Sequence, residues 1–81
     1  MSAYREMIRV ALARAGRIGM NPDHVEAYMR LEHGTLDALS PAQFRAEVET
    51  AAACVLASSD SDNARLAWSF GLGPKPEGGN K

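Results

Sequence analysis

The sequence has one cysteine and no long apolar run, and each shortage excludes a class of protein. Cys54 is the only cysteine among the 81 residues, so an intramolecular disulfide is excluded. No apolar run approaches the roughly 18 residues that cross a bilayer, and arginines interrupt the apolar stretches of residues 1–20. We therefore expect neither a signal peptide nor a membrane span, and a cytoplasmic location in which the thiol stays reduced.

The sequence also lacks a strand pattern and a large net charge. No segment alternates between apolar and polar residues in the manner of a β-strand. The net charge of −1 gives no general attraction to nucleic acid. Charge is nevertheless uneven: residues 1–20 carry four arginines and one acid, whereas residues 21–50 carry six acids and two arginines. We expect these two parts to pack together. The alternative is an electrostatic contact with an acidic partner or phosphates through Arg5, Arg9, Arg14 and Arg17.

Residue types that support catalysis or metal binding occur without the spacing that such sites need. His24 and His33 are nine residues apart, which puts them on opposite faces of a helix. The sequence has no paired cysteines, no HExxH motif and no glycine-rich phosphate loop with its lysine. We therefore predict a non-enzyme with no catalytic residues, no cofactor and no metal.

Helical periodicity predicts the first two helices. The first covers residues 2–15, and Gly16 and Gly19 mark its end. The second begins with Asn21 as the cap and Pro22 in the first turn, and it buries Val25, Tyr28 and Met29. A break at Gly34 is preferred, and continuation to Leu39 is the alternative. The predicted buried stripe of the first helix consists of Tyr4, Met7, Ile8, Ala11, Leu12, Ala15 and Ile18.

The third helix has the clearest start in the chain. Ser40 can cap it, Pro41 fits the first turn, and Gln43 completes a capping box. Residues 51–57 are apolar almost all round, so we expect this helix to be central and Cys54 to be a small buried residue. The predicted buried face consists of Phe44, Val48, Ala51, Ala52 and Val55.

A short fourth helix and a tail complete the chain. Asp60 or Ser61 is the expected cap of a helix over residues 62–70, with Gly71 at its end. Glycine and proline dominate the last residues and cannot bury apolar surface. We predict an all-α fold over residues 1–72, a small bundle of three main helices plus a short C-terminal helix, and a disordered tail over residues 73–81.

Three large apolar residues lie outside the predicted buried faces. Trp68 lies roughly 155° from the centre of the apolar face of its helix, taking about 100° per residue. Val10 and Leu31 are similarly misplaced on the first and second helices. Large apolar groups at the surface, tryptophan above all, are enriched at binding sites. We therefore expect Trp68, Val10 and Leu31 to form an interface.

These observations predict a non-enzymatic protein–protein interaction module, self-associated as a homodimer, with a further protein partner of unknown identity. In size and style the chain is similar to the short helical accessory proteins of phages and mobile elements, such as adaptors and inhibitors, although no individual residue carries that similarity. The alternative is a nucleic-acid-associated accessory protein that uses the arginines of the first helix.

Overall fold

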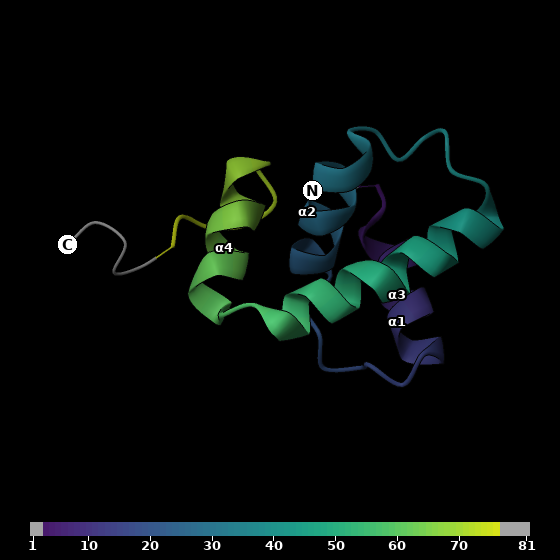
Figure 1. Ribbon diagram of the computed structural model, residues 1–81, viewed down its shortest axis with the longest axis horizontal. Helices are drawn as coiled ribbons and strands as arrows, with labels where there is room; N and C mark the ends of the chain where they lie inside the picture. The colour runs from purple at the N-terminus through teal and green to yellow at the C-terminus, as the bar shows by residue number, and fades with distance from the viewer. Residues whose placement is uncertain (1–2, 77–81) are drawn as a thin grey trace.

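The computed structural model describes residues 3–76, and within them the chain is all-α (Figure 1). No strand occurs in these residues, which confirms the predicted fold class. The last helix and the first helix each have 10 residues. The four helices are α1 (Arg5–Arg14), α2 (Pro22–His33), α3 (Pro41–Ala57) and α4 (Asp60–Ser69).

Side-chain caps fix the starts of three helices. The Ser40 hydroxyl accepts from Gln43 N at 3.1 Å, and the Gln43 side chain accepts from Ser40 N at 2.9 Å, which completes the predicted capping box. Asn21 caps α2 as predicted, accepting from Asp23 N at 2.8 Å. The predicted cap of α4 was wrong. Ser59 caps it by accepting from Asp62 N at 3.1 Å, which already places Asp60 in the first turn.

Glycines with positive φ follow the ends of α1, α2 and α4, in a backbone conformation that other residues avoid. Gly34 has φ +75° and follows the last residue of α2, which confirms the break in preference to continuation to Leu39. Gly71 has φ +73°, and Leu72 N donates to Ala67 O at 2.9 Å. This bond folds the chain back over the last turn of α4, as expected for a glycine-terminated helix.

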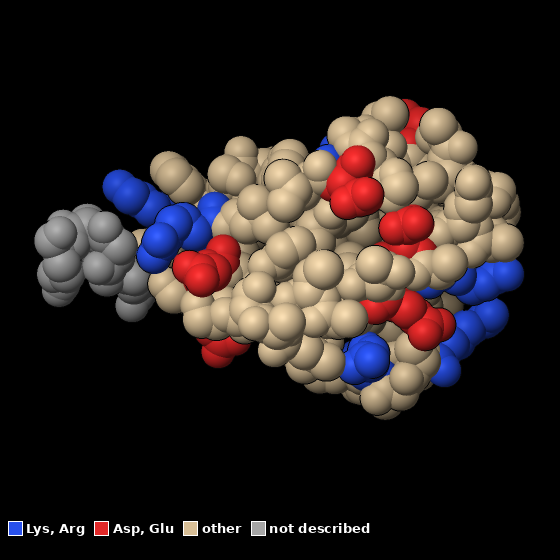
Figure 2. Space-filling view, viewed as in Figure 1, with Lys and Arg blue, Asp and Glu red and all other residues tan. Residues whose placement is uncertain are grey.

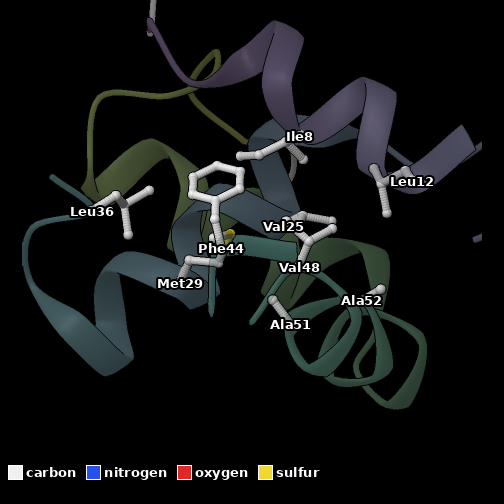
Figure 3. Close-up of a cluster of buried hydrophobic side chains, with 9 residues drawn as sticks. All are labelled: Ile8, Leu12, Val25, Met29, Leu36, Phe44, Val48, Ala51 and Ala52. Atoms are coloured by element: carbon white, nitrogen blue, oxygen red, sulfur yellow. The ribbon is translucent and has the colours of Figure 1, made fainter. Parts of the chain in front are cut away.

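The core lies where α1, α2 and α3 meet (Figure 3). Ile8 and Leu12 of α1 point toward Val48 and the other buried side chains of α2 and α3. Tyr4 packs against this cluster and stacks on Phe44, with ring centroids 6.0 Å apart. The buried cluster consists of Ile8, Leu12, Val25, Met29, Leu36, Phe44, Val48, Ala51 and Ala52.

The central helix is α2, and the prediction that the third helix would be central was wrong. In Figure 1 α2 lies between α4 and α1, and it packs against all three other helices. Because α4 packs along α2, the far side of α3 is left uncovered. Cys54 is consequently exposed, contrary to the prediction that it is buried.

Polar contacts fasten α4 to the rest of the bundle. The Tyr28 hydroxyl hydrogen-bonds with the side chains of Ser58 and Asn63, each at 2.9 Å. Asn63 is buried, and its side-chain amide donates to Val55 O at 3.0 Å. The beginning of α4 is therefore tied to α2 and to the end of α3, while Ala67 supplies its buried apolar contact.

Only part of the predicted tail lies within the described residues. Residues 73–76 have no regular secondary structure. They lie beside α4 and the beginning of α2, where they line a groove together with Asn21, His24 and Ala67. Residues 77–81 of the predicted disordered tail lie outside the described residues.

Candidate functional site

The three apolar residues singled out from the sequence are all on the surface of this chain. The exposed fractions are 45% for Val10, 62% for Leu31 and 47% for Trp68. They lie on α1, α2 and α4, respectively, and the structure does not gather them into one patch. Val10 lines grooves beside α1. Leu31 and Trp68 are likewise exposed, on α2 and α4.

Further large apolar side chains are exposed, including two that were predicted to be buried. Met7 is 51% exposed, because it lies about 100° around α1 from the buried Ile8. Ile18 is 82% exposed, because α1 ends at Arg14 and its periodicity does not extend to the loop. Leu56 and Phe70 are exposed as well.

Met7 and Val10 belong to an open groove between α1 and the beginning of α3, which we call the α1/α3 groove. Its volume is about 310 Å³. Phe44 is buried and is held in place by its stack on Tyr4, so it is a fixed part of the groove. The apolar lining consists of Met7, Val10 and Ala11 of α1 with Pro41 and Phe44 of α3. Pro41 and Phe44 could be associated with Val10 only through the fold, since they lie on α3 whereas Val10 lies on α1.

Charged side chains border the α1/α3 groove. Arg14 approaches it from α1 and Arg45 from α3, and Glu6 is the one acid among its lining residues. Glu6 Oε1 lies 3.2 Å from Arg9 Nη1, which offsets its charge. Within residues 3–76 neither Arg14 nor Arg45 forms an ion pair. In Figure 2 basic side chains gather beside α1 and the beginning of α3, so the border of the groove is positive.

The four predicted arginines do not act as one surface. Arg5 Nη1 forms an ion pair with Asp23 Oδ1 at 2.7 Å, the one contact of this set with the acidic middle segment, and Arg9 pairs with Glu6. Arg14 borders the α1/α3 groove. Arg17 lines a different groove, of about 760 Å³, with Ile18 and Leu56. The sequence identified the arginines but could not show which of them are neutralised by the fold.

No protein-family model, curated protein or solved structure matches this chain.

The remaining polar groups form contacts that hold the bundle together. Glu26 is fully buried, and its Oε2 accepts from Arg30 Nε at 2.8 Å. The Arg30 guanidinium also lies 5.7 Å from the centre of the Tyr4 ring. His33 Nε2 lies 3.0 Å from Glu47 Oε1, which joins α2 to α3. The Arg30–Tyr4 and His33–Glu47 contacts connect α2 to the start of α1 and to α3, whereas the Glu26–Arg30 pair lies within α2. The burial of Glu26 was not predicted from the sequence. The available signal was its place next to the buried Val25 in α2.

The part of the chain that the structure describes contains neither a cluster of metal ligands nor a membrane-spanning helix. No three His, Cys, Asp or Glu side chains of residues 3–76 are placed to hold a metal ion together. No helix in the same residues has the length and apolar character that crossing a membrane requires. The α1/α3 groove offers apolar contact inside and two arginines at its border.

Proposed function

We propose that this chain is a non-enzymatic protein-interaction module that self-associates as a homodimer and serves as an adaptor or inhibitor for another protein. The observation that carries the proposal is the grouping of exposed apolar side chains from different elements into shared grooves. Met7 and Val10 meet Pro41 in one groove, and Ile18 meets Leu56 in another. Single exposed apolar side chains are ordinary, but grouped ones are typical of binding surfaces.

The distribution of these groups supports more than one contact. Trp68 of α4 and Val10 of α1 lie on helices at opposite ends of the helical part in Figure 1. A standard interface covers about 800 Å² per partner, roughly 15% of the 5213 Å² surface of this chain. One such interface does not cover both ends. A homodimer formed through α4 and its neighbours would leave the α1 end available to a second protein.

Sedimentation equilibrium over a hundredfold range of concentration tests self-association. We expect a monomer–dimer equilibrium that Trp68→Ala weakens by about tenfold or more, because exposed tryptophans are common binding hot spots. Arg65→Ala is the matched control, since it truncates an exposed side chain on the same helix without removing apolar surface. A monomer mass of 8.7 kDa at every concentration would refute self-association.

A nucleic-acid-associated role is the second proposal, and Arg14, Arg17 and Arg45 support it because they form no ion pair within residues 3–76. Binding to random duplex DNA that weakens steeply with salt would favour it, since released counterions control phosphate contacts. Absence of such binding would favour the protein-interaction role. We rank the protein role first because all three arginines border grooves that also contain exposed apolar side chains, Val10 in one and Ile18 in the other.

A further inference from the structure

We infer that the α1/α3 groove binds an amphipathic helix with acidic flanks, presented by a partner protein. This inference rests on the proposed protein-interaction role and names the chemistry of the partner. It is carried by two properties of the same groove. Its interior is apolar, and the two arginines at its border are left without carboxylate partners in the described residues.

The interior matches the way grooves bind amphipathic helices. Met7 and Val10 are three residues apart on α1, so their side chains lie next to each other along one side. Phe44 of α3 is buried beneath the groove and is held in place by its stack on Tyr4, so it supports the lining from below. A volume of about 310 Å³ accommodates a few apolar side chains of a helix face, rather than an extended polar ligand.

The border specifies the charge of the occupant. The charge of Glu6 is offset by Arg9 at 3.2 Å, which leaves Arg14 and Arg45 as the uncompensated charges around the groove. These two arginines come from different helices and flank the same apolar interior. Acidic residues beside the apolar face of a docked helix would pair with both, whereas basic residues there would be repelled.

The same border argues against a second copy of this chain as the occupant. In a two-fold symmetric dimer centred on the groove, each subunit would present the same surface to its partner. Such a dimer would bring the two positive borders, each with Arg14 and Arg45, close together, which is unfavourable. An acidic partner segment meets no such repulsion. The homodimer interface is therefore expected elsewhere on the chain.

Methyl NMR of the full chain tests this inference with a synthetic probe. The probe is an amphipathic peptide with leucines on one helical face and glutamates flanking that face, and a matched peptide has lysine at every glutamate position. We expect the glutamate peptide to shift the methyl resonances of Met7 and Val10 saturably. Little change is expected at Ile18 and Leu56, which line the groove of about 760 Å³. The lysine peptide should bind about tenfold more weakly or not at all.

Charge reversal at the border completes the test. Arg45→Glu should weaken the glutamate peptide by about tenfold and improve the lysine peptide, as should Arg14→Glu. Arg17→Glu is the matched control, because it makes the same charge change in the other groove. Arg14→Glu places negative charge at the end of α1, where it can weaken folding. Arg45→Glu still tests the charge preference of the groove, because residue 45 lies near the beginning of α3, where negative charge is tolerated.

Three results would overturn the inference: binding of neither peptide, equal binding of both, or methyl shifts confined to Ile18 and Leu56. Sedimentation separates this failure from failure of the proposed function. If the chain dimerises but binds neither peptide, self-association is supported and the inference about the α1/α3 groove is refuted. If the chain stays monomeric but binds the glutamate peptide with the expected charge dependence, the inference about the groove is supported and the homodimer is refuted.

Discussion

At the residue scale, the Glu26–Arg30 pair shows how burial sets the importance of an ion pair. Glu26 is fully buried, whereas the Arg30 side chain is 28% exposed, and the two are joined at 2.8 Å within α2. A buried carboxylate that loses a paired cation keeps the whole cost of desolvation but loses the part of the offsetting attraction that this cation supplied. The exposed Arg9–Glu6 pair on α1 has the same chemistry without that cost, because water solvates both groups.

We therefore expect Arg30→Met to lower the free energy of unfolding by about 3 kcal/mol. The same substitution at Arg9 is the control and should cost less than about 1 kcal/mol. Urea unfolding followed by circular dichroism measures both. Equal, small losses for the two variants would show that the Glu26 carboxylate does not depend on Arg30.

At the scale of the helix, local capping chemistry determines where α3 begins. The Ser40 side chain and the Gln43 side chain each satisfy a backbone amide of the first turn. Ser40→Ala should destabilise the chain by about 1 kcal/mol, because one of these amides loses its acceptor. Ser40→Asn retains a capping side chain and should stay close to the parent in thermal unfolding. If Ala and Asn behave alike at this position, the capping box does not contribute to stability.

The same locality explains which features could be predicted from the sequence. Ser40, Asn21 and Gly34 act on the backbone within a few residues of themselves, so the starts of α2 and α3 and the end of α2 could be predicted. The start of α4 was misplaced because Ser59, Asp60 and Ser61 are all competent caps, and nothing local ranks them.

Burial depends on which helix covers which face, and this could not be predicted with the same success. Cys54 lies in an apolar stretch but is exposed, because α4 turns back along α2 instead of covering α3. Met7 was assigned to the core by periodicity alone, and its exposure beside Val10 became apparent only with α3 in place. Only a small part of the candidate groove was thus visible from the sequence: Val10 was recognised as surplus, whereas Met7, Pro41 and Phe44 required the packing of two helices.

At the scale of the whole molecule, the core and α4 are stabilised differently. The large apolar core residues come from α1, α2, α3 and the loop that contains Leu36, and α4 adds Ala67 and the buried amide of Asn63. Apolar burial contributes broadly over a surface, whereas a buried amide contributes only while its hydrogen bonds are made. The attachment of α4 therefore depends on a few specific bonds, and α4 should be able to open while the three-helix core stays folded.

Amide hydrogen exchange tests this separation. We expect the amides of α4 to exchange faster than those of the buried part of α2 in the parent chain. Asn63→Ala removes the bonds to Tyr28 and Val55 and leaves those groups without their partners, while alanine itself favours the helix. Exchange in α4 should accelerate by about tenfold, with α2 nearly unchanged. Ser61→Ala, an exposed change in the same helix, should leave both rates as they are. Equal acceleration in α2 and α4 would show instead that the four helices unfold as one unit, with the Tyr28–Asn63 contact as part of the common core.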